Sequence, residues 1–196
     1  MSGAGGIRLH LGQFLLLVLV NGLVGVMVGQ ERSILAPMAA QEFGLASRAA
    51  VFSFLATFGT TKAVCNLVAG SLADRFGRKQ VLVLGWLFAV PVPLILMAAD
   101  RWLWVVLANV LLGINQGLCW SATVIMKLDL AGPRQAGLAT AANEWAGYLG
   151  AASAAWATAY LAALYGLRPV PFYPGLLLAL AGLVLSLVFV RPTRVR

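Results

Sequence analysis

Six long apolar runs, separated by short polar segments, constrain this chain more than any other feature. They cover residues 11–37, 51–72, 81–99, 103–126, 136–165 and 172–190. One helix needs roughly 20 apolar residues to cross a bilayer, whereas the strands of a membrane barrel alternate in polarity over about 10 residues. The runs therefore predict an all-α polytopic membrane protein, in which residues 1–196 form a single bundle of six transmembrane helices.

The composition excludes several classes of protein. The chain is 61% hydrophobic and 10% charged, whereas soluble domains carry about 25% charged residues. A soluble enzyme or a nucleic-acid binder is therefore excluded, and the net charge of +8 is attributed to membrane-flanking loops. Cys65 and Cys119 lie inside apolar runs, so neither a disulfide framework, a metal site nor a cofactor is expected. Because no G-x-S-x-G, H-E-x-x-H, C-x-x-C or P-loop pattern occurs, a membrane enzyme finds little support.

The distribution of Lys and Arg predicts the orientation of the bundle, because cytoplasmic loops are enriched in these residues. With the N-terminus inside, nine basic residues fall on the cytoplasmic side: Arg8, Arg75, Arg78, Lys79, Lys127, Arg134, Arg191, Arg194 and Arg196. Four fall outside: Arg32, Arg48, Arg101 and Arg168. Both termini are therefore expected in the cytoplasm.

A weak internal repeat relates the two halves of the chain. The first run contains Asn21-x3-Gly25-x3-Gly29, and the fourth contains Asn109-x3-Gly113-x3-Gly117, at an offset of 88 residues. The ends of the second and fifth runs match at an offset of 89. Because three helices are an odd number, these matches predict two inverted three-helix repeats, the alternative being chance similarity among Gly-, Ala- and Leu-rich helices.

The segment after the second run carries a motif. It reads Gly70-Ser71-Leu72-Ala73-Asp74-Arg75-Phe76-Gly77-Arg78-Lys79 and resembles G-x-L-a-D-r-x-G-r-k, the signature between helices 2 and 3 of the major facilitator superfamily. The resemblance implies a cytoplasmic gating motif comprising Gly70, Asp74, Arg75, Gly77, Arg78 and Lys79, the alternative being an ordinary basic loop. We expect Gly70 to permit close helix packing, Gly77 to form a tight turn, and the three basic residues to lie at the headgroups.

The resemblance extends to most of the chain. The segment Gly25-x3-Gly29-Gln30-Glu31-Arg32 resembles the first helix of the family, and Asp129-x2-Gly132-Pro133-Arg134 resembles its loop between helices 4 and 5. Many members carry an Arg in helix 4 at the position of Asn109. Because Asn109 replaces it, the resemblance does not extend to proton coupling assisted by that Arg. Members usually have twelve helices in two halves around a central cavity, with helices 1 and 4 lining it and helices 2 and 5 facing the other half. This chain resembles the first half, so we expect a fragment, or a half-size protein that forms a homodimer or pairs with a second six-helix half.

Polar residues inside the runs are the remaining functional signal. Lys62 is twelve residues before Asp74, about 18 Å along a helix, and Glu144 is ten residues after Arg134, about 15 Å along. Ionisable residues at such depth usually face a wet cavity or a partner. The candidate substrate or coupling residues are Glu31, Arg32, Lys62, Asn66, Asn109, Gln116 and Glu144.

Structural roles are open for the same residues. The asparagines would serve equally well in hydrogen bonds between helices. Glu31 and Arg32 would equally fit positions at the outer membrane interface, near a helix end. Lys62 and Glu144 would also fit a structural ion pair, while Lys127 is interpreted chiefly as a membrane-edge residue.

The sequence favours transport of a small solute by alternating access, as a secondary active transporter of a bacterial inner (plasma) membrane. The alternative is a non-transporting subunit or degenerate half-transporter that assembles with another six-helix chain. Both would lie in the lipid bilayer, with no nucleic-acid partner. A slight excess of positive charge in the runs favours an anionic or zwitterionic small-molecule substrate.

Overall fold

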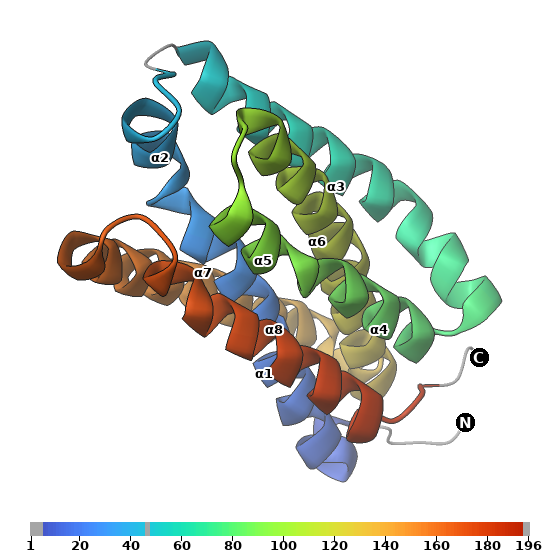
Figure 1. The fold of residues 1–196 in the computed structure, drawn as a ribbon. Helices are drawn as coiled ribbons and strands as arrows, with labels where there is room; N and C mark the ends of the chain where they lie inside the picture. The colour runs from blue at the N-terminus through green and yellow to red at the C-terminus, as the bar shows by residue number, and fades with distance from the viewer. Residues whose placement is uncertain (1–5, 46–47, 194–196) are drawn as a thin grey trace.

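The computed structural model describes residues 6–45 and 48–193, and all regular elements in these ranges are helices (Figure 1). The long helices are α1 (Leu11–Arg32), α3 (Arg48–Phe76), α6 (Trp102–Ala131), α7 (Ala136–Tyr165) and α8 (Tyr173–Val188). Shorter ones are α2 (Leu35–Gln41), α4 (Arg78–Ala89), α5 (Pro91–Ala98) and the 3-10 turns η1 (Ile7–His10), η2 (Pro133–Gln135) and η3 (Val170–Phe172). The all-α prediction is confirmed.

The helix boundaries differ from the predicted runs where proline or helix ends intervene. The run 11–37 is divided between α1 and α2, and the run 81–99 is divided between α4 and α5. The second division falls just before Pro91, which lacks the amide hydrogen that would continue the helical ladder. By contrast, α3 and α6 extend past the predicted runs, to Phe76 and Ala131.

Five helical segments of the described chain are long and apolar enough to cross a membrane: Ile7–Gln41, Phe52–Phe76, Arg78–Ala98, Trp102–Ala131 and Val170–Val188. The predicted count of six is therefore not met on this criterion. The exception is α7, which matches α6 in length at 30 residues but is less apolar. Its sequence is dominated by Ala and Gly and includes Asn143 and Glu144, so its low hydropathy reflects small and polar side chains.

The connections gather at two ends of the bundle. At one end, which we call the motif end, the Ile7 amide donates to Gln135 Oε1 at 2.9 Å, and Lys79 Nζ donates to the Leu187 carbonyl at 2.7 Å. At the far end, Arg168 donates to the Ala99 carbonyl at 2.5 Å and forms an ion pair with Glu42. The chain therefore runs between the two ends six times, and the described residues at its beginning and its end lie at the same end (Figure 1). Arg194 and Arg196, part of the predicted charge bias, lie outside the described residues.

The two halves of the chain pack with the symmetry that the repeat predicts. The most extensive helix contacts are α1 with α7 and α3 with α6, pairs that an exchange of the two three-helix units would interconvert. The repeated glycines are in both contacts, because a methyl group on Gly25 would overlap the Gly147 carbonyl and one on Gly117 would overlap Cys65. This pairing is the one expected of an inverted repeat, and the repeated glycines lie where the helices approach closely.

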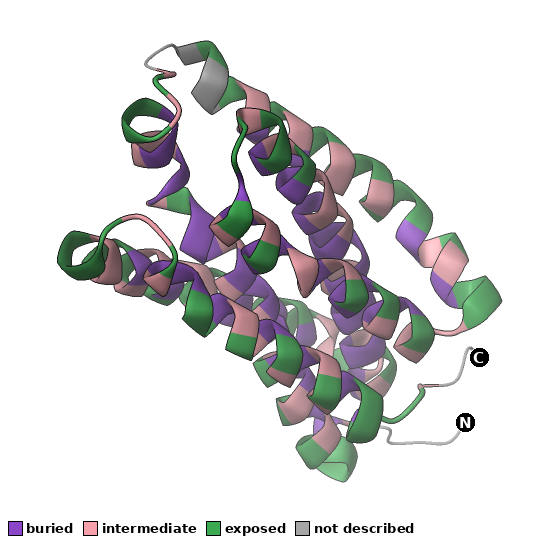
Figure 2. Cartoon of the chain, in the orientation of Figure 1, coloured by how far each residue is buried: buried purple, intermediate pink, exposed green. Residues whose placement is uncertain are grey.

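The bundle buries a continuous apolar core and exposes apolar side chains on its outside. Leu17, Trp86 and Phe172 are fully buried, whereas Leu67 is 84% exposed and Trp156 is 73% exposed. Exposed residues run along the outer sides of α3, α7 and α8 (Figure 2). Large exposed apolar surfaces of this kind suit a lipid environment.

Candidate functional site

The sequence motif forms the junction of α3 and α4 at the motif end. α3 continues to Phe76, so the predicted loop is reduced to Gly77 alone, whose φ of 95° lies in the region that favours glycine. The predicted tight turn is confirmed. The expectation that Gly70 permits close packing is wrong within this bundle, because a Cβ there would meet no atom within 4 Å.

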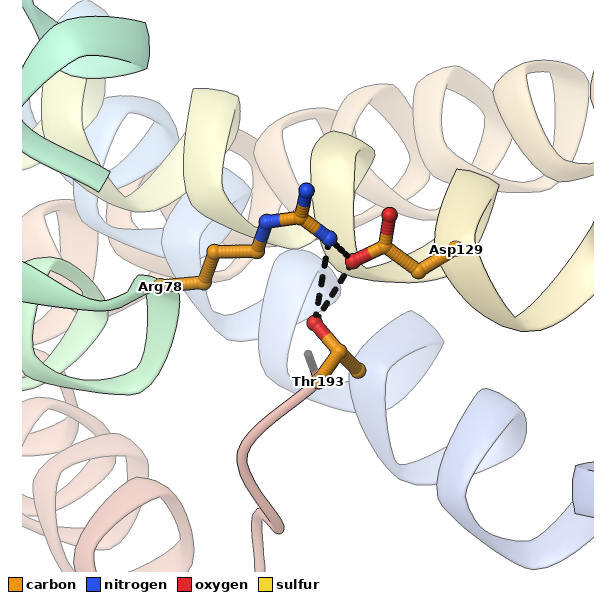
Figure 3. Close-up of polar contacts among 3 residues, drawn as sticks. All are labelled: Arg78, Asp129 and Thr193. Atoms are coloured by element: carbon orange, nitrogen blue, oxygen red, sulfur yellow. Dashed lines mark hydrogen bonds and ion pairs between the residues drawn. The ribbon is translucent and has the colours of Figure 1, made fainter. Parts of the chain in front are cut away.

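Arg78 joins three elements instead of lying free at the headgroups (Figure 3). Its guanidinium forms an ion pair with Asp129 near the end of α6, and Thr193, after α8, donates to Asp129 Oδ2 at 2.7 Å. Both charged side chains are largely shielded, at 10% and 24% exposure. Asp74 acts electrostatically on Arg78 but is itself exposed. Asp129 lies in the segment that resembles the loop between helices 4 and 5 of the superfamily, but nothing in the sequence indicates that it pairs with Arg78.

Arg75 and Lys79, the other basic residues of the motif, also have partners at the motif end. The Arg75 guanidinium lies 5.2 Å from the Phe76 ring centre, and Lys79 is bound to the Leu187 carbonyl. The motif therefore ties the beginning of α4 to the ends of α6 and α8, while Asp74 and Arg75 remain exposed.

A buried amide network joins α1, α6 and α7. Asn21 donates to the Asn143 carbonyl at 2.7 Å, and the Thr123 hydroxyl lies within 3.1 Å of the side-chain oxygens of both asparagines. All three side chains are fully buried. This network fixes the orientation of α7 and thereby of the neighbouring Glu144, which accepts from Asn143 Nδ2 at 3.1 Å. For Asn21, the structural role proposed from the sequence is the one seen.

Trp120 links the two ionisable residues that the sequence places deepest in the apolar helices. Its indole nitrogen donates to Glu144 Oε1 at 2.8 Å, and the ammonium of Lys62 lies 4.8 Å from its ring centre. Lys62 and Glu144 are in electrostatic reach of one another, but the ion pairs found among the described residues do not join them. Gly147 provides the space for the indole, because a methyl group there would overlap it. The structure thus places an aromatic ring between charges for which the sequence allowed a direct ion pair.

These residues belong to a partly exposed polar surface that we call the open face, formed by Lys62 and Asn66 of α3, Trp120 and Ser121 of α6, and Glu144 and Tyr148 of α7. The Ser121 hydroxyl donates to Asn66 at 3.2 Å, and Tyr148 packs edge-on against Trp120. The sequence identified Lys62, Asn66 and Glu144. It did not identify Ser121, whose neighbours in space come from other helices.

Other predicted site residues are buried behind this face. Gln116 donates to the Val24 carbonyl at 2.7 Å, and Asn109 donates to the Val105 carbonyl within its own helix. Glu31 is 2% exposed, and its carboxylate interacts with the Asn109 side chain. Glu31 and Asn109 line a cavity of about 10 Å³, which has room for about one water molecule. Arg32 lines the same cavity but remains exposed.

Lys127 corrects one expectation. It is fully buried and donates to the Leu17 carbonyl at 3.1 Å, so it is not a membrane-edge residue. Glu144 acts electrostatically on it as well as on Lys62. Without Lys127, eight Lys and Arg residues remain on the predicted cytoplasmic side, against four on the outer side.

Comparison with known proteins agrees with this architecture. Residues 13–196 match the sequence profile of the Major Facilitator Superfamily, and this match covers most of the chain. No curated protein matches the chain significantly. Members of the superfamily are membrane transporters and not enzymes. On the extent of the profile match, this chain belongs to the Major Facilitator Superfamily.

Proposed function

We propose that this chain moves a small solute across the membrane by alternating access, with the open face as one wall of the solute pathway. The observation that carries the proposal is the arrangement of Lys62, Trp120 and Glu144. Ionisable side chains deep in apolar helices are costly unless they face a partner or a wet cavity. Here they are half-exposed, and Trp120 contacts both of them, so that the charges interact across the ring and not in a direct ion pair.

The pathway needs a second six-helix unit that faces this one. Sites for small molecules usually enclose about 300–1,000 Å³, whereas the cavity beside Glu31 has room for about one water molecule. A solute would therefore bind between the open face and a facing unit. The twelve-helix organisation of the superfamily supports this arrangement. A non-transporting subunit is the weaker candidate, because it would have no use for charged side chains on this face.

The motif end supplies the gate in this proposal. Arg78, Asp129 and Thr193 hold α4, α6 and the segment after α8 as one block. Asp74 remains exposed at the same end, so its carboxylate is free to accept hydrogen bonds from a helix N-terminus of the facing unit. Breaking that contact would open the motif end.

We further propose a plasma-membrane location, in a bacterial inner membrane, with both termini in the cytoplasm and transport driven by a secondary gradient. The basic residues at the motif end support the orientation, because Arg75, Arg78 and Lys79 gather there with Arg134.

Two-sided labelling tests the pathway without knowledge of the solute. In a chain with Cys65→Ala and Cys119→Ala, we expect an Asn66→Cys variant to react with a membrane-impermeant maleimide from either side of a vesicle. The matched control is Leu177→Cys on α8, which is 67% exposed on an apolar surface and should react from neither side. Labelling of Asn66→Cys from one side alone, or from neither, would contradict the proposed pathway.

Uptake into proteoliposomes tests the role of the charged residues. Across a panel of labelled small solutes, the wild-type chain should accumulate at least one. Lys62→Met should abolish that uptake while the melting temperature stays within a few degrees of wild type, because neither ion pair found in residues 6–45 and 48–193 involves Lys62. A Lys62→Met variant that is stable and still transports would remove Lys62 from the pathway.

A further inference from the structure

Two cations from different helices share one aromatic ring beside the open face. Lys62 of α3 lies 5.9 Å from the centre of Phe58, and the guanidinium of Arg32, at the end of α1, lies 5.4 Å from it. Phe58 itself is 8% exposed, so the ring forms a fixed floor between the two charges. Lys62 interacts electrostatically with Glu144, which attracts it, and with Arg32, which repels it.

The nearby acids are already engaged or buried. Glu144 Oε1 accepts from both Trp120 and Asn143, and its single charge acts on two lysines, Lys62 and the buried Lys127. Glu31 is 2% exposed, lines the small cavity and interacts electrostatically with Arg32. The ion pairs of the described chain, Arg78 with Asp129 and Arg168 with Glu42, involve neither Lys62 nor Arg32. The accessible side of this cluster therefore has an excess of positive charge.

We propose that Lys62 and Arg32 bind the carboxylate of an organic anion, which is the transported solute; the assignment rests on the proposed function. Arg presents a planar fork that matches a carboxylate, and Lys adds a point charge. The rings of Phe58, Trp120 and Tyr148 surround the charges with apolar surface, which suits a carboxylate with a hydrocarbon body. A bound anion would compensate the positive charge that remains because Glu144 acts on two lysines at once.

The melting temperature of the purified chain, residues 1–196, in a neutral detergent provides the test. The probes are benzoate, phenylacetate, hexanoate and succinate at millimolar concentration, each compared with its uncharged amide. At least one carboxylate should raise the melting temperature by a few degrees, as expected for a ligand well above its Kd, while its amide has no effect. The shift should be lost in Lys62→Met and in Arg32→Gln, and partly retained in Lys62→Arg.

An Arg8→Gln variant is the matched control, because it removes one positive charge from an exposed position at the motif end and should keep the full shift. The proposal is overturned if no carboxylate stabilises the chain, if the amides stabilise it equally, or if the shift survives in Lys62→Met. Stabilisation by phosphatidylglycerol without any effect of the carboxylates would also overturn it, in favour of a lipid headgroup. In each of these cases, two-sided labelling of Asn66→Cys would still support a transporter with a different solute.

Discussion

Replacing Gly25 by alanine tests whether the contact between α1 and α7 limits the stability of the bundle. A Cβ at Gly25 would overlap the carbonyl group of Gly147, which is backbone and cannot rotate away. The two helices would have to separate along their most extensive contact. Overpacking of this kind typically costs about 1–3 kcal/mol, against which alanine recovers roughly 0.5–1 kcal/mol of helix propensity. We therefore expect Gly25→Ala to lower the free energy of unfolding by about 1–2 kcal/mol.

Gly22→Ala is the matched control on the same helix. A Cβ there would lie 3.6 Å from the Ala146 carbonyl oxygen, an ordinary van der Waals contact, so the gain in helix propensity should leave stability unchanged or slightly higher. Thermal unfolding in one detergent compares the two variants, with about 2–4 °C expected per kcal/mol for a chain of this length. If Gly25→Ala and Gly22→Ala melt at the same temperature, the close approach of α1 and α7 is not what the repeated glycines provide.

Three further measurements address the motif, the open face and the topology. Arg78→Gln and Asp129→Asn should each lower stability, and a double-mutant cycle should give a coupling energy of about 1 kcal/mol. Arg75→Gln is the control, because Arg75 is in neither ion pair of the described residues. Additive effects of Arg78→Gln and Asp129→Asn would contradict the contact. Trp120→Phe keeps a ring beside Lys62 but removes the hydrogen bond to Glu144, so the melting temperature should fall by an amount equivalent to about 1–2 kcal/mol, and an unchanged melting temperature would argue against that bond. Cysteines at the exposed positions Gln41 and Gln80, again without Cys65 and Cys119, should be labelled from opposite sides of the membrane; labelling of both from one side would refute the six crossings.

The sequence alone predicted the helical class, the positions of the six apolar runs and the inverted repeat. These features are local or periodic, because a continuous apolar stretch of sufficient length has few alternatives to a helix in a bilayer. The turn at Gly77 was equally readable, since glycine readily adopts a positive φ. The boundaries were less certain: the break before Pro91 was not predicted, and the continuation of α3 to Phe76 was missed because its last turns carry polar residues.

The tertiary structure decided which polar residues meet and which stay accessible. In the sequence, Gln116 and Lys62 look alike, because both are polar residues within apolar runs. In the structure, Gln116 donates to the backbone of α1, whereas Lys62 lies on the open face. Lys127 read as a loop residue and is fully buried. Neither the pairing of Arg78 with Asp129 nor the position of Trp120 between Lys62 and Glu144 could be predicted, because each joins side chains from helices far apart in sequence. Hydropathy identifies most of the helices that cross the membrane. The rotation of each helix about its axis depends on close packing at glycines such as Gly25 and Gly147, and that rotation determines which charged side chains reach the open face.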